Sequence, residues 1–209
     1  MTVQLQANKA FDAQDIERLV QDHQVHRDVY TSQDVYALEM QHLFANVWVF
    51  VGHESQTPKH GDYFTTQIGS QPVIQVRHSD SKIKVLHNRC PHKGTKIAID
   101  RHGNTGTFFR CPYHAWSFET DGRLKAVPLE SGYSDTSFET TENANGIKPV
   151  GAVHNHRGFV FARLADSGIS FDDFFGDSLS SIDNMVDRSP EGRLEAVSYT
   201  HLTLPTRIF

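Results

Sequence analysis

The sequence lacks the features that mark several classes of protein. Its 209 residues include only two cysteines, so a framework of disulfide bonds does not hold the chain together. Lys and Arg number 20 against 25 Asp and Glu, and no block of basic residues occurs. This balance argues against nucleic acid or an anionic membrane surface as a partner.

Long hydrophobic segments are also missing. The longest apolar runs, such as residues 47–51, are far shorter than the about 18 residues that cross a bilayer. The start of the chain has neither the basic segment nor the apolar segment of an export signal, so we expect a cytoplasmic protein. What the sequence does contain is 38% hydrophobic residues, which suffices for a core, and an unusual 13 histidines.

The spacing of apolar residues predicts a helical start, a β-rich middle and a helical end. Helical spacing covers residues 12–21 and about 32–45, the second with a capping box from Thr31 and Asp34. Short runs rich in Val, Ile and Phe, separated by turn residues, predict antiparallel strands at 47–52, 62–68, 71–77, 82–87, 107–110, 115–119, 147–153 and 159–164. Helical spacing returns over 171–186, although Gly176 weakens its middle.

These elements predict a mainly β fold, an antiparallel barrel or sandwich with N-terminal and C-terminal helical extensions. We assign residues 1–45 to a helical segment, 46–165 to the β domain and 166–195 to a helical linker. Residues 196–207 resemble the translation of a transposase-type sequencing adapter. We therefore interpret 196–209 as an artefact and expect the natural coding sequence to break off near Glu195.

Both cysteines lie in short segments that also hold a histidine. The segments are Cys90-Pro91-His92-Lys93-Gly94 and Cys111-Pro112-Tyr113-His114-Ala115-Trp116, with eighteen residues between His92 and Cys111. The pattern admits loops without a metal, a structural Zn²⁺ site, or a [2Fe–2S] cluster with two Cys on one iron and two His on the other. Zinc modules usually pair Cys with Cys and His with His along the chain. Because each segment here carries one of each, the pattern favours the cluster.

The two segments resemble the cluster loops of the Rieske iron–sulfur family. The resemblance implies a Rieske-type antiparallel β domain in which Cys90 and Cys111 bind one iron and His92 and His114 bind the other. Neutral imidazoles make such a cluster less negative than an all-Cys cluster, so it accepts an electron more readily.

Residues near the predicted ligands indicate a Rieske protein of low reduction potential. Respiratory Rieske proteins carry an extra Cys pair, which forms a disulfide, and Ser and Tyr hydroxyls that bond to the sulfurs. The corresponding positions here are Thr95, Tyr113, Trp116 and Phe118. We therefore expect a potential near the low end of roughly −150 to +300 mV, which suits electrons from NAD(P)H.

From about Tyr30 to Leu194 the chain resembles the large (α) subunit of ring-hydroxylating Rieske oxygenases. The segments that carry the resemblance are 44–48, 111–118, 121–124, 156–162 and 171–186. It implies an NAD(P)H-dependent reductase or a ferredoxin as electron donor, and a homotrimer or an α3β3 assembly. It also implies a mononuclear Fe(II), held by two His and one carboxylate, that activates O₂. That iron motif is absent here, so we expect this Fe(II) only in a missing catalytic domain and no catalytic residue in this chain.

The predicted function is the electron-accepting part of a multicomponent oxygenase that hydroxylates an aromatic substrate, with an aromatic acid favoured by overall resemblance. One alternative is a stand-alone Rieske ferredoxin, although the helical segments on either side of the β domain argue against it. Another is the Rieske part of a monooxygenase for quaternary amines such as choline or carnitine. A zinc-stabilised interaction module would be colourless, whereas a Rieske protein would be red-brown.

Overall fold

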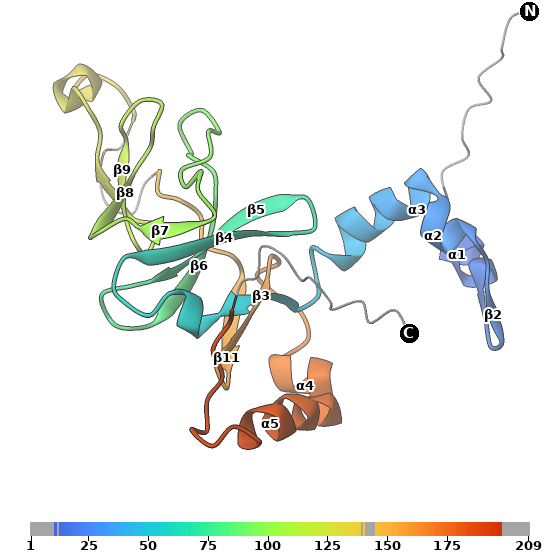
Figure 1. Ribbon diagram of the computed structural model, residues 1–209. Coiled ribbons are helices and arrows are strands. Elements are labelled where there is room, and N and C mark those ends of the chain that lie inside the picture. Colours follow the sequence, from blue (N-terminus) through green and yellow to red (C-terminus); the bar gives the residue numbers. More distant parts are fainter. Residues whose placement is uncertain (1–10, 12, 139, 141–144, 198–209) are drawn as a thin grey trace, which may run out of the picture.

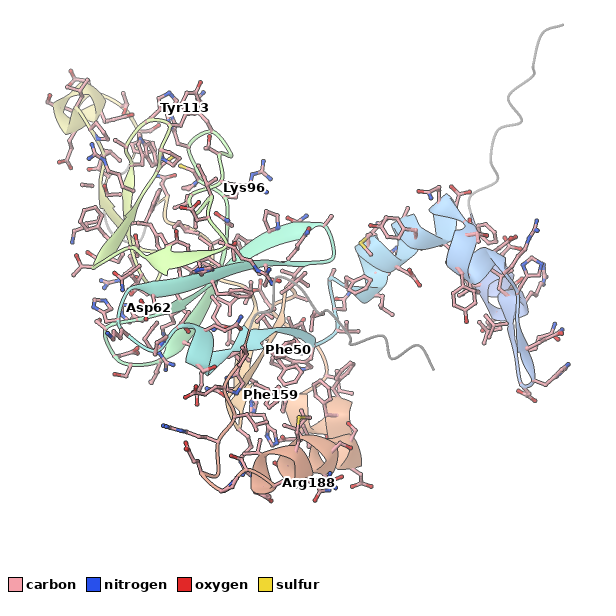
Figure 2. The ribbon with its side chains drawn as sticks, viewed as in Figure 1. Phe50, Asp62, Lys96, Tyr113, Phe159 and Arg188 are labelled. Carbon is pink, nitrogen blue, oxygen red and sulfur yellow. The ribbon has the colours of Figure 1, made fainter. Side chains whose placement is uncertain are left out.

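The computed structural model describes residues 11, 13–138, 140 and 145–197. Figure 1 shows a body of short antiparallel sheets, with a helical arm extending from one side. Near the other end of the chain, α4 (Phe171–Phe175) and α5 (Leu179–Asp187) lie beside β11 (Ala152–His156). This architecture confirms the predicted mainly β fold with helical extensions at both ends.

The four-stranded sheet has the strand order β6-β5-β4-β7. Its strands are β4 (Asp62–Ile68), β5 (Gln71–Arg77), β6 (Ile83–His87) and β7 (His102–Asn104). A tight turn joins β4 to β5 at Gly69, whose φ of +55° suits glycine. The bounds of β4 and β5 match the prediction, because both segments are rich in β-branched and aromatic residues and are bounded by turn residues. The prediction missed β7, whose His-Gly-Asn sequence has no apolar run.

A three-stranded sheet of order β11-β12-β3 connects the body to the C-terminal helices. It contains β3 (Val49–His53) and β12 (Phe159–Arg163) beside β11. Trp48, Phe161 and Phe171 form an aromatic cluster where this sheet meets α4. The strand predicted over 147–153 starts too early, since residues 147–151 contribute only an isolated bridge between Pro149 and Leu86.

The third sheet has the order β10-β9-β8 and holds the second Cys-His segment between two of its strands. Its strands are β8 (Phe108–Arg110), β9 (Ser117–Glu119) and β10 (Leu124–Ala126), and the short helix η3 (Glu130–Tyr133) follows. The first Cys-His segment leaves β6 on the way to β7. Both segments therefore lie in loops between strands. The strand predicted over 115–119 starts later, at Ser117, because Ala115 and Trp116 belong to the second loop.

The N-terminal arm is more broken than its apolar spacing predicts. It contains α1 (Ala13–Leu19), β1 (Val20–Gln21), β2 (Gln24–Val25), α2 (Asp28–Thr31), α3 (Gln33–Leu38) and the π-helix η1 (Glu39–Leu43). The predicted capping box is wrong, because Thr31 ends α2 and the hydroxyl of Ser32 instead accepts a hydrogen bond from the N–H of Val35.

The predicted C-terminal helix is divided in two. Gly176, with a φ of +48°, ends α4, and a short 3₁₀ turn, η4 (Gly176–Ser178), leads into α5. Glycine destabilises a helix interior and tolerates positive φ. The helix therefore breaks at Gly176, where the sequence predicts its weak point. Residues 188–197 are not helical, and the segment interpreted as an artefact lies outside the described residues from 198 onward.

Two further clusters of buried side chains hold the sheets together. The larger cluster includes Cys90, Cys111 and Trp116, so the Cys-His loops are anchored in the core. The second cluster packs β-branched residues of β3, β5 and β12 around Ile68. The short helix η2 (Glu54–Gln56) follows β3. Within the described part of the chain, no helix is long and apolar enough to span a membrane.

Candidate metal centre

The first Cys-His loop is closed by hydrogen bonds to its own backbone. The N–H of Cys90 donates to the carbonyl of Thr95 at 2.8 Å, and the N–H of Gly94 donates to the carbonyl of Cys90 at 2.8 Å. Gly94 has a φ of +75°, a left-handed conformation that glycine adopts without strain.

The second loop repeats this geometry. The N–H of Cys111 donates to the carbonyl of Trp116 at 2.8 Å, and the N–H of Ala115 donates to the carbonyl of Cys111 at 3.0 Å. Ala115 stands four residues after its cysteine, as Gly94 does, and has a φ of +59°. The two loops are therefore matched turns, although alanine occupies a left-handed position in the second.

Asn88 fastens the base of the first loop, a role that motif spacing did not identify. Its side chain is buried, and its Oδ1 accepts hydrogen bonds from the N–H groups of Ile97 and Ala98 at 2.9 and 3.0 Å. Its Nδ2 donates to the carbonyl of Ala98 at 2.7 Å. The sequence could have indicated this role, because Asn88 directly follows the apolar strand β6 and comes two residues before the candidate ligand Cys90.

The structure brings the two thiols together. Cys90 and Cys111 are 2% and 3% exposed, form no disulfide, and lie in the same cluster of buried side chains. Burial raises the pKa of Cys90 most, and proximity to Cys111 raises it further, whereas the backbone N–H groups of His92 and Lys93 act in the opposite direction. A bound cation would offset the cost of burying two thiolates side by side.

The two imidazoles also meet. The ring centroids of His92 and His114 are 4.8 Å apart, and His92 stacks on Trp116 while His114 stacks on Tyr113. Partial burial, followed by the charges of His114 and Lys93, lowers the pKa of His92. That shift favours the neutral imidazole, which is the form that binds metals.

The donors are thus arranged as a pair of sulfurs and a pair of rings. Among the described residues, no group of three or more His, Cys, Asp or Glu side chains is gathered around one point for a single ion. A binuclear cluster instead places its ligands in two pairs, one on each iron. Two thiols and two imidazoles on matched loops fit a cluster of that kind.

The fold and the paired loops define a class, the Rieske iron–sulfur proteins. Residues 47–140 match the family described as Rieske [2Fe-2S] domain. The chain is 37% identical over 168 residues to toluate 1,2-dioxygenase subunit alpha from Pseudomonas putida, covering 79% of this chain and 36% of that subunit. It is 39% identical over 153 residues to the oxygenase subunit of glycine betaine monooxygenase from Chromohalobacter salexigens, covering 73% of this chain and 33% of that subunit.

A solved structure agrees with these relatives. Naphthalene 1,2-dioxygenase from Rhodococcus sp. bound to indole aligns with a TM-score of 0.74 and 29% identity, over 85% of this chain and 39% of that chain. The chain therefore contains a Rieske [2Fe–2S] domain, which implies a [2Fe–2S] cluster, in a sequence that matches the α subunits of ring-hydroxylating dioxygenases. It spans only about 36% of the length of its toluate relative.

Proposed function

We propose that Cys90 and Cys111 bind one iron of the [2Fe–2S] cluster and that His92 and His114 bind the other. The supporting observation is the pairing itself, in which two thiols are buried in one cluster of side chains and two imidazole ring centroids lie 4.8 Å apart on matched loops. When bound, the cluster supplies a one-electron acceptor and donor. The loops hold the thiols away from water and leave the edges of both rings nearer to solvent, with His114 exposed and His92 half-buried.

The wider proposal is that this chain is the electron-accepting part of an oxygenase α subunit. An NAD(P)H-dependent reductase or a ferredoxin would reduce it, and the full protein would be a homotrimer or an α3β3 assembly. The chain matches only about 36% of the toluate relative, so we place the mononuclear Fe(II) and O₂ chemistry outside it. We propose a cytoplasmic location, where thiols such as Cys90 and Cys111 stay reduced.

The proposed substrate is an aromatic acid, which the toluate relative supports by its name. The glycine betaine relative supports a second candidate, a quaternary amine, because it is 39% identical over 153 residues. Sequencing the source DNA past codon 195 tests the oxygenase assignment. A frame that continues into a two-His, one-carboxylate iron motif supports it, whereas a natural stop there would favour a stand-alone electron carrier.

The ligand assignment is tested by spectroscopy on the purified chain. We expect two iron and two sulfide per chain, a red-brown colour, and a Rieske-type electron paramagnetic resonance (EPR) signal after reduction. Cys90→Ser and His114→Ala should each abolish the signal, while His102→Ala on the exposed edge strand β7 should retain it. A colourless protein with one zinc, or a signal that survives in the first two variants, would overturn the assignment.

A further inference from the structure

A cleft of about 660 Å³ opens beside the first Cys-His loop. Its lining includes Cys90 and His92 of that loop together with Gly146 and Lys148. The residues that line the cleft include neither Cys111 nor His114. The cleft therefore reaches the candidate cluster on the side of His92.

The cleft is positively charged although the chain is not. Arg89, Lys93 and Lys148 line it with exposed side chains, and none of the described residues that line it is acidic. Residues 88–99, which include the first loop, contain three cationic side chains and no Asp or Glu. The whole chain, in contrast, has a formal net charge of −5.

What distinguishes these cations is that three of them line a single cleft. Among the described residues, none of the three cations of the cleft forms an ion pair. Elsewhere in the body, Arg157 pairs with Asp187 at 2.6 Å and Lys125 pairs with Glu119. Unpaired like charges repel one another, so the described residues create a positive field next to the candidate cluster.

We infer that this cleft is the docking surface for an electron-donor protein with an acidic surface, and that electrons enter on the side of His92. The inference rests on the proposed function and names the partner surface of the same site. Opposite charges would steer the acidic face of the donor into the cleft and fix its orientation. No bond forms or breaks in the encounter: one electron leaves the donor, which is oxidised, and reduces the cluster between the loops.

The test compares a protein donor with a small one. The probes are a reduced [2Fe–2S] ferredoxin of strongly negative net charge and photoreduced 5-deazariboflavin, which is uncharged. Stopped-flow absorbance gives the second-order rate constant for reduction of the cluster-loaded chain by each probe. Lys148→Glu should slow reduction by the ferredoxin about tenfold at low ionic strength, and the difference should largely vanish at about 0.5 M salt.

Lys82→Glu is the matched control. It makes the same change in net charge but lies at the opposite end of β6 from His87, which lines the cleft. The control should leave reduction by the ferredoxin within about twofold of the parent. Arg89→Gln, also on an exposed position, provides a second variant should Lys148→Glu fold poorly.

The possible outcomes distinguish a failure of the proposed docking surface from a failure of the proposed cluster. Equal rates for Lys148→Glu and Lys82→Glu, or rates of ferredoxin reduction that do not depend on salt, overturn the docking surface. Slowing with deazariboflavin as well would mean that the substitution damages the cluster, and this also overturns it. A chain that assembles no reducible cluster overturns the proposed function itself, whichever variant is used.

Discussion

The imidazole of His92 lies parallel to the indole of Trp116, with an interplanar angle of 2° and ring centroids 4.7 Å apart. Trp116 is 3% exposed and is held in turn by an edge contact with Phe138 at 5.4 Å. A buried ring thus lies against one candidate ligand, whereas His114 stacks on Tyr113, which is itself exposed. The two imidazoles therefore stack on rings that differ in burial.

Replacing Trp116 should therefore disturb His92 in particular. Trp116→Leu removes the ring surface, and we expect the EPR lines of the reduced protein to broaden as His92 samples more than one orientation. The lost burial should lower the free energy of unfolding by about 2–4 kcal/mol. Phe118→Leu is the control, because Phe118 is fully buried in the same cluster of side chains. It should destabilise the fold but leave the EPR lines narrow.

The left-handed conformation of Ala115 predicts a stabilising substitution. Its φ of +59° costs an L-residue about 1–2 kcal/mol, which glycine does not incur. Ala115→Gly should therefore raise the free energy of unfolding by about 1 kcal/mol, measured by urea denaturation. Gly94→Ala at the equivalent place should lower it, since the added Cβ would also lie 3.2 Å from Nε of Arg89. A destabilising Ala115→Gly would contradict the assigned backbone.

Stability should fall in mild acid because His53 is buried. Its pKa is lowered from 6.5, mainly by burial, with Glu54 acting in the opposite direction, and its Nε2 has no hydrogen-bond partner. The unfolded chain therefore binds the proton more tightly than the folded chain. The contribution of His53 to the free energy of unfolding is complete above pH 6.5. It is lost as the pH falls through that value, by at most about 1.4 kcal/mol per pH unit for one group.

Urea denaturation between pH 5 and pH 8 measures the slope of the free energy of unfolding against pH. His53→Asn should flatten it, because the Asn Oδ1 can accept the hydrogen bond that Nδ1 now takes from the N–H of Ser55. His87 and His154 also have lowered pKa values, chiefly through burial, so part of the slope should remain. An unchanged slope in His53→Asn would show that His53 does not contribute.

The same histidine requires a glycine at position 158. A Cβ on Gly158 would lie 2.4 Å from Nε2 of His53, and the φ of Gly158 is +94°. Gly158→Ala should therefore lower the free energy of unfolding by more than about 2 kcal/mol. Gly176→Ala is the matched control, since Gly176 also has a positive φ but no atom within 4 Å of the added Cβ. It should cost about 1 kcal/mol, from the backbone alone.

One carboxylate joins α5 to the hairpin between β11 and β12. Asp183 accepts a hydrogen bond from Nε2 of His156 at 2.9 Å and lies 3.5 Å from Arg157. Asp183→Ala should loosen the helix by about 1 kcal/mol, seen as faster amide hydrogen exchange in α5 at pH 6. Asp187→Ala, whose side chain is 63% exposed, should have less effect. Equal exchange in the two variants would refute a special role for Asp183.

Motifs and local spacing predicted much of this protein. The Cys-His segments, the strands β4 and β5, and the weak point at Gly176 could all be predicted because each depends on neighbours within a few residues. The weaker predictions concern places where short-range signals are faint. Examples are the three-residue strand β7 and the cap of α3, where Ser32 rather than Thr31 makes the hydrogen bond. At both places, tertiary contacts or backbone geometry determined the local structure, because the local composition is compatible with more than one structure.

The sequence by itself determined which residues could hold a cluster, because two cysteines and two histidines at that spacing leave few alternatives. Only the tertiary structure decided how they meet. It placed the thiols together in the core, laid Trp116 against His92, and brought Lys148 next to a loop more than fifty residues earlier. Such contacts come from strands and loops distant in the chain packing together, which no local pattern encodes.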